Sequence, residues 1–106
     1  MTVNLEVHAW SPYVRAFTEA LLDTLEAELT IDRVRVSSEA GSGDRWELSN
    51  SWFVVPRCGL DDAEIGDYID LEADFGDHDR AALIRAQVHP LNQDQVGVQL
   101  ELLEVL

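Results

Sequence analysis

The chain has 106 residues, enough for one hydrophobic core, so we expect a single domain over residues 1–106. A hydrophobic share of 46% argues against intrinsic disorder, and no apolar run approaches the roughly eighteen residues that a membrane span needs. Twenty-one acidic residues against seven arginines and no lysine give a formal net charge of −14, which disfavours nucleic acid and anionic membranes as partners.

The first two predicted elements are a strand and a helix. Apolar residues alternate with polar ones over residues 3–9, a period of two that indicates a half-buried strand. Ser11 followed by Pro12 is typical of a helix start, with the serine as N-cap and the proline in the first turn. Apolar residues then recur every three or four positions, as they do on one face of a helix, so we predict a helix over residues 12–29.

A β-hairpin is predicted next. Val34 and Val36 alternate with polar residues, and residues 39–44 have the glycine and serine content of a hairpin loop. We expect the return strand over residues 45–55. Asn50 interrupts the apolar face of that strand, which suggests a bulge or a buried, hydrogen-bonded amide.

Three more strands complete the predicted fold. Apolar and polar residues alternate over residues 69–75, 84–88 and 96–102, with short turns between these segments. Because every second position is polar, one face of each strand meets solvent, and this favours an antiparallel arrangement. The predicted fold is therefore α+β and mostly antiparallel β, a six-stranded sheet or small barrel with one packed helix.

The second part of the chain, about residues 33–106, resembles a PilZ domain. Such domains carry an Asp/Asn-x-Ser-x-x-Gly motif, a Gly-Asp strand opening and a Gly-Val closing strand. Residues 47–52 (ELSNSW), 65–71 (IGDYIDL) and 95–100 (QVGVQL) stand at these places. The resemblance implies a small six-stranded barrel and a bacterial role as a cyclic di-GMP receptor or as an adaptor in signalling, motility or pilus systems.

The ligand-binding part of the PilZ pattern is missing from this chain. No Arg-x-x-x-Arg arm precedes the first barrel strand, and Arg33 and Arg35 are spaced so that both should point along one strand face. Glu47 replaces the motif's Asp or Asn, and Trp52 replaces its glycine, where a ligand needs close approach to the backbone. The helix at 12–29 is also outside the usual pattern. We therefore expect no cyclic di-GMP binding and no cofactor.

No constellation of residues predicts catalysis or metal binding. His8, His78 and His89 fall on three separate elements without shared spacing, so we expect exposed or locally hydrogen-bonded histidines. Cys58 is the only cysteine, which excludes an internal disulfide, and no Cys/His cluster has the spacing of a zinc site. A nucleophilic role for Cys58 lacks a second motif element. We predict that the protein is not an enzyme.

Three origins of the acidity stay open: a solvated surface suited to a salty or high-GC host, a docking face for a basic partner, and a mimic of nucleic acid charge. Trp46 and Trp52 are expected to fill the core of the central hairpin, whereas Trp10 falls on the opposite face from its apolar neighbours, as an interface anchor does. The candidate partner-binding residues are Trp10, Tyr13, Arg33, Arg35 and Trp52.

These observations predict a cytoplasmic, non-enzymatic protein-interaction or adaptor module that is PilZ-like and binds a protein partner. The alternative is an acidic inhibitor or immunity protein that blocks a basic nucleic-acid-binding enzyme. An inhibitor of that kind should associate with strong salt dependence, while an adaptor held by apolar contacts should tolerate salt. The apolar end of the last strand, residues 102–106, further predicts a homodimer.

Overall fold

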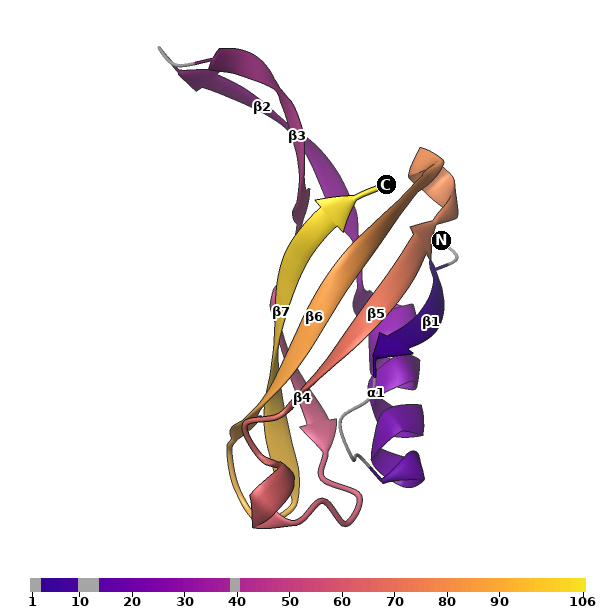
Figure 1. The fold of residues 1–106 in the computed structure, drawn as a ribbon, viewed down its shortest axis with the longest axis vertical. Coiled ribbons are helices and arrows are strands. Elements are labelled where there is room, and N and C mark those ends of the chain that lie inside the picture. Colours follow the sequence, from indigo (N-terminus) through magenta and orange to yellow (C-terminus); the bar gives the residue numbers. More distant parts are fainter. Residues whose placement is uncertain (1–2, 10–13, 39–40) are drawn as a thin grey trace.

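The computed structural model describes residues 3–9, 14–38 and 41–106. Five strands curl around one helix, and a two-stranded hairpin extends from one end of this body (Figure 1). The molecule measures 46 × 28 × 21 Å along its principal axes. The elements in chain order are β1 (Val3–Ala9), α1 (Arg15–Glu28), β2 (Ile31–Ser38), β3 (Gly41–Leu48), β4 (Trp52–Pro56), β5 (Tyr68–Phe75), β6 (Arg80–Pro90) and β7 (Gln95–Val105), with short 3-10 turns at Asp62–Glu64 and Gly76–His78.

The main sheet is antiparallel and has the order β1-β5-β6-β7-β4. It curls into a half-barrel whose concave face is apolar, because alternate residues of each strand point inward. The buried residues contributed by β4 to β7 are Phe53, Val55, Ile69, Leu71, Ala73, Phe75, Ala82, Ile84, Ala86, Val88, Val96, Val98 and Leu100. The predicted α+β class and antiparallel pairing are confirmed.

Helix α1 closes the open side of the half-barrel. Phe17, Leu21 and Leu25 lie four residues apart on one helical face and are fully buried. The helix contacts both edge strands, β1 and β4, so it bridges the two ends of the curled sheet. It begins at Arg15, with Val14 at the N-cap, three residues later than predicted. The expected capping pair at residues 11 and 12 lies outside the described residues.

Strands β2 and β3 form a separate two-stranded sheet. They pair residue for residue from Ile31↔Leu48 at the base to Ser38↔Gly41 near the turn. The base is anchored, because Ile31 is fully buried and Leu48 packs against the core. Beyond the base the hairpin reaches away from the body (Figure 1). A two-stranded ribbon has little stability of its own in water, so this arm depends on contacts made at its base.

The predicted return strand over residues 45–55 is wrong, because the structure divides it between the two sheets. Part of it belongs to β3, which pairs with β2, and the rest belongs to β4, which pairs with β7. Asn50 is exposed and neither bulged nor buried; its Oδ1 accepts a hydrogen bond from the N–H of Trp52 at 3.1 Å. This Asx turn ends one strand before the next begins. The expected six-stranded sheet is therefore a sheet of five strands and a hairpin of two.

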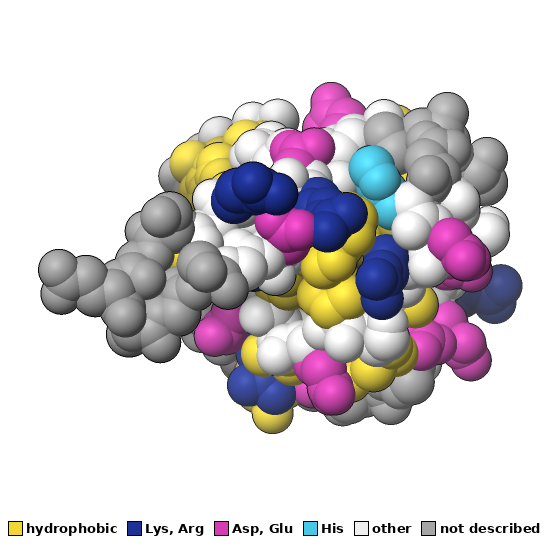
Figure 2. All heavy atoms as spheres, turned by 90° about the horizontal axis from the view of Figure 1, so that it is seen from above, with side chains coloured by type: hydrophobic (Ala, Val, Ile, Leu, Met, Phe, Trp, Pro, Cys, Tyr) yellow, Lys and Arg dark blue, Asp and Glu magenta, His cyan; other side chains and the backbone are white. Residues whose placement is uncertain are grey.

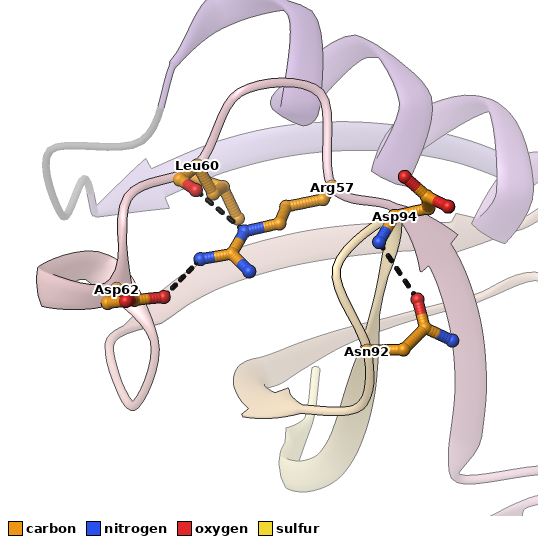
Figure 3. Close-up of polar contacts among 5 residues, drawn as sticks. All are labelled: Arg57, Leu60, Asp62, Asn92 and Asp94. Carbon is orange, nitrogen blue, oxygen red and sulfur yellow. Dashed lines mark hydrogen bonds and ion pairs between the residues drawn. The ribbon is translucent and has the colours of Figure 1, made fainter.

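The end of the body opposite the hairpin is tied together by polar contacts (Figure 3). Arg57 donates from Nε to the carbonyl of Leu60 at 2.7 Å and pairs through Nη2 with Asp62. Its backbone N–H donates to the carbonyl of Asp94, in the turn between β6 and β7, at 2.9 Å. That turn is itself held by Asn92, whose Oδ1 accepts from the N–H of Asp94 at 2.9 Å. These bonds fix the loop after β4 to the β6–β7 turn.

Candidate docking groove between β3 and β7

The groove begins where the pairing of β4 with β7 stops. β4 pairs with β7 only from Gln95 to Gln99, and the last bond on this edge runs from the N–H of Leu100 to the carbonyl of Ser51 at 2.7 Å. Beyond Leu100, β6 is the only strand of the described chain that pairs with β7. Backbone groups of alternate residues face the same edge, so Leu102 directs its N–H and C=O away from β6. One wall of the groove is therefore a free strand edge.

The opposite wall is the outer edge of β3. The N–H of Ser49 donates to the carbonyl of Thr30 at 3.1 Å, which fixes the backbone groups of Ser49 toward β2. By the same alternation, the N–H and C=O groups of Trp46 and Leu48 face away from β2 and toward β7. In Figure 1, β3 runs down alongside the ascending end of β7. Two strand edges without a partner strand thus face each other.

A hollow of about 430 Å³ lies between these two edges. The chain passes from β3 in one sheet to β4 in the other over three residues, 49–51, and Ser51 lines the hollow. The residues that line it are Arg45, Trp46, Glu47, Leu48, Ser51, Leu100, Glu101 and Leu102. The lining alternates: apolar residues face the core, and charged residues face out.

The outer rim of the groove carries a row of ionic contacts. Arg45 pairs with Glu47 on β3, and on the other side Glu101 stands opposite Arg85 in the β6–β7 ladder. Arg85 donates from Nε and Nη2 to the two carboxylate oxygens of Asp70, at 2.8 and 3.1 Å. This hydrogen bonding is the main cause that raises the pKa of Arg85 above its ordinary value, and the charge of Glu101 adds to it.

The predicted residues Arg33 and Arg35 lie together on one face of the hairpin, as their spacing predicts. Both pair with Asp44 of β3, which Arg35 approaches to 3.6 Å through its Nε. Trp46 stands opposite Arg33 in the β2–β3 register. Figure 2 shows arginine side chains gathered around an apolar patch at this end of the molecule. The described residues of β2 and β3 thus balance three arginines against three carboxylates, on a chain whose net charge is strongly negative.

Trp46 joins the hairpin to the body, a contact that sequence reasoning missed. Its ring lies 5.3 Å from the ring of His78 in an edge-on arrangement, and the guanidinium of Arg80 lies 5.6 Å from its centroid. The expected place of Trp46 in the core is confirmed in part, because it is half-buried against the core cluster. Local sequence patterns do not predict these contacts, because the residues that make them lie more than thirty positions apart in the chain.

Trp52 lies on the convex face of the main sheet and not in the core, so its predicted core position is wrong. It is 44% exposed, its ring covers Gly97 of β7, and it lies 5.7 Å from the ring of His89. A side chain at position 97 would overlap the indole. Sequence reasoning assigned Trp52 the wrong face because it treated residues 45–55 as one strand.

The remaining candidates fall outside this site. Trp10 and Tyr13 lie outside the described residues, as does the side chain of His8. Cys58 is exposed in a tight turn, where it has a φ of 50° and precedes Gly59. In the part of the chain that the structure describes, no three His, Cys, Asp or Glu side chains gather as a metal site would require. Across the same residues, no helix has the length and apolar character to cross a membrane.

Comparisons with known proteins found no match to the chain among family models, curated proteins or solved structures.

Proposed function

We propose that this chain is a non-enzymatic protein-interaction module, acting as an adaptor in the cytoplasm, and that it docks its partner in the β3–β7 groove. The observation that carries this proposal is the pair of strand edges that face each other across the hollow. Unpaired N–H and C=O groups along a strand edge are a template for an extended segment of another chain. The hollow leaves both edges accessible at once.

The walls of the groove also supply side chains that suit a protein interface. Trp46 lines the groove and is only half-buried, and Leu103, which follows the lining residue Leu102 at the irregular position of β7, is 42% exposed. Tryptophan and arginine are the residues that most often contribute binding energy at interfaces, and Arg33 and Arg35 lie on the Trp46 face of the hairpin. Two of the candidate partner-binding residues therefore lie on β2, next to the strand that forms one wall of the groove.

The acidic face of β1 and β5 supports a second candidate function, that of an inhibitor of a basic enzyme. Glu6 and Glu72 stand directly opposite each other in the β1–β5 ladder, and Asp74 lines the same shallow hollow of about 370 Å³. Carboxylates grouped on one sheet face favour a basic partner. This function requires association that weakens steeply as salt rises, whereas docking in the groove requires little salt dependence.

Two further expectations stay predictions. The PilZ resemblance rests on residues 47–52, 65–71 and 95–100, which run from β3 into β4, into β5 and along β7. A homodimer through the apolar end of β7 rests on Leu103 and Leu106, which are both exposed. Light scattering at high micromolar concentration tests the homodimer, and a monomer mass would refute it.

Site-specific photo-crosslinking tests the proposed function. A photoreactive phenylalanine analogue is placed at Leu103, beside the groove, or at Asp23 on the exposed face of α1 as the matched control. Irradiation in cells of the source organism should attach one defined protein at position 103 and not at position 23. Identical products at both positions, or no protein adduct at 103, would contradict docking at this site.

A further inference from the structure

We infer that the convex face of the main sheet holds a binding site for a neutral oligosaccharide. The inference goes beyond the proposed function, because it concerns a second site and a different class of ligand. It rests on three features of this face. A hollow there is lined by planar polar side chains, an aromatic residue stands at each end of one row across the sheet, and the charges of the lining cancel.

Four side chains cross the convex face in one row. Trp52 of β4 pairs with Gln99 of β7, which pairs in turn with Gln87 of β6. Gln87 pairs with Tyr68 of β5. All four occupy outward-facing positions of their strands and are exposed. Neighbouring strands lie ~4.8 Å apart, so about 14 Å of sheet separates the two aromatic residues. This distance is longer than one sugar ring, so an oligosaccharide is needed to reach both.

Both aromatic rings are held by their neighbours and still meet solvent. The indole of Trp52 covers Gly97 and lies 5.7 Å from the ring of His89. The guanidinium of Arg85 lies 4.2 Å from the ring centroid of Tyr68. Trp52 and Tyr68 nevertheless remain 44% and 43% exposed. The C–H face of a sugar ring is apolar and packs on such a ring, while the sugar hydroxyls point outward from the sugar's rim.

A hollow of about 300 Å³ lies in the middle of this face, between β6 and β7. Its lining residues are Arg85, Gln87, Gln99, Leu100 and Glu101. The side chain of Leu100 is buried on the concave side, so its backbone forms the floor, and the four polar side chains form the walls. The volume is at the lower end of the range for small-molecule sites. Leu100 and Glu101 also line the β3–β7 groove, across β7 from this hollow.

The walls keep hydrogen-bonding groups free for a ligand. Asp70 takes two of the five N–H groups of Arg85. Gln87 donates to the carbonyl of Gly66 at 3.4 Å, which leaves its Oε1 available. Among the described residues, none hydrogen-bonds to the side chain of Gln99. Amide, carboxylate and guanidinium groups each present two hydrogen-bonding positions side by side, an arrangement that matches two adjacent hydroxyls of a sugar.

The charge and polarity of the lining favour a neutral ligand that both donates and accepts. Arg85 and Glu101 cancel, and the other walls are uncharged, on a chain whose net charge is −14. An anionic ligand such as a nucleotide would meet Glu101 and the negative field of the whole chain. A proline-rich peptide offers mainly carbonyl acceptors, so it would leave the carboxylate and amide oxygens of the walls without donors. Sugar hydroxyls match both kinds of group.

An NMR titration of the ¹⁵N-labelled protein tests the inference. The probes are cellohexaose, xylohexaose, mannohexaose, chitohexaose and maltohexaose, each added into the millimolar range that a shallow site requires. Hexaproline is the matched peptide probe. The signals followed are the side-chain amides of Gln87 and Gln99 and the indole N–H of Trp52, which report on the hollow and on one end of the row.

At least one hexasaccharide should shift these signals saturably, with the same Kd at low and high salt because the ligand is neutral. Gln99→Ala should weaken binding by about fivefold, since it removes hydrogen bonds to the ligand. Gln95→Ala is the matched control, the same change on the same face of β7 but outside the hollow, and it should leave the Kd unchanged. Tyr68→Leu should also weaken binding by about fivefold, because it removes the aromatic face.

Three results would overturn the inference. They are no shift of these signals with any of the five hexasaccharides, shifts that vanish at high salt, and equal losses for Gln99→Ala and Gln95→Ala. Shifts with hexaproline alone would assign the face to a peptide and overturn it as well. Crosslinking at position 103 separates these results from the proposed function. A partner captured there without saccharide binding leaves the proposed function standing, and saccharide binding without a captured partner leaves this inference standing alone.

Discussion

The packing of Trp52 on Gly97 gives a prediction that can be worked out from the structure. Just over half of the indole surface is covered, because the side chain is 44% exposed. For a tryptophan that is roughly 130 Å² of buried surface, worth about 3 kcal/mol at ~25 cal/mol per Å² and about 2 kcal/mol after allowing for a compact unfolded chain. Trp52→Ala should therefore lower the free energy of unfolding by about 2 kcal/mol.

Gly97→Ala should act through the same contact. The new Cβ would overlap the indole, so the ring must swing away and lose most of its packing. Alanine in a strand offsets part of this loss, by about 0.5 kcal/mol, because glycine loses more backbone freedom on folding. The net cost should be about 1 kcal/mol. With Trp52 already replaced by alanine, the overlap is gone, and Gly97→Ala should stabilise the protein by about 0.5 kcal/mol.

A double-mutant cycle measures this coupling. The four proteins are unfolded in urea and followed by circular dichroism, which does not depend on the tryptophan removed. The coupling energy should be about 1.5 kcal/mol. Gly43→Ala is the matched control, since a Cβ there meets nothing within 4 Å, and it should be neutral or slightly stabilising in both backgrounds. Costs of Trp52→Ala and Gly97→Ala that simply add would show that the ring does not lie on Gly97.

Three further outcomes are expected. Phe17→Ala should lower the free energy of unfolding by about 3–5 kcal/mol in urea, because Phe17 is fully buried under the half-barrel; a loss below about 1 kcal/mol would contradict the place of α1. Cys58→Gly should raise thermal stability, by about 0.5–1 kcal/mol, and Cys58→Val should lower it, because position 58 has a φ of 50°; the reverse ranking would refute that backbone. Cyclic di-GMP should give no saturable heat by calorimetry, since Arg33 and Arg35 share Asp44 on one strand face; saturable binding would make these arginines the first to replace.

Much of the fold is readable from the sequence because it follows local periodicity. The alternation over residues 69–75, 84–88 and 96–102 predicts three strands that the structure confirms within β5, β6 and β7. The four-residue spacing of Phe17, Leu21 and Leu25 likewise predicts the buried face of α1. These patterns work because each strand or helix buries one face against the same core.

The site is less predictable because it depends on where one strand leaves the sheet. The triplet Ser49, Asn50 and Ser51 contains three turn-forming residues in a row, a signal that two strands meet there and not one. If residues 45–55 are interpreted as one strand, neither the free edge of β7 nor the exposed position of Trp52 can be predicted. The contact of Trp46 with His78 and Arg80 joins distant segments, so only the three-dimensional fold brings it into view.

Amide hydrogen exchange at two positions of β7 tests the central claim most directly. Leu100 and Leu102 both direct their N–H groups toward the same edge, but only that of Leu100 has an acceptor, the carbonyl of Ser51 at 2.7 Å. In the free protein, exchange measured by NMR should be slow at Leu100 and fast at Leu102. Slow exchange at Leu102 would mean that β3 or another segment already pairs with this edge, and the groove would not be open to a partner.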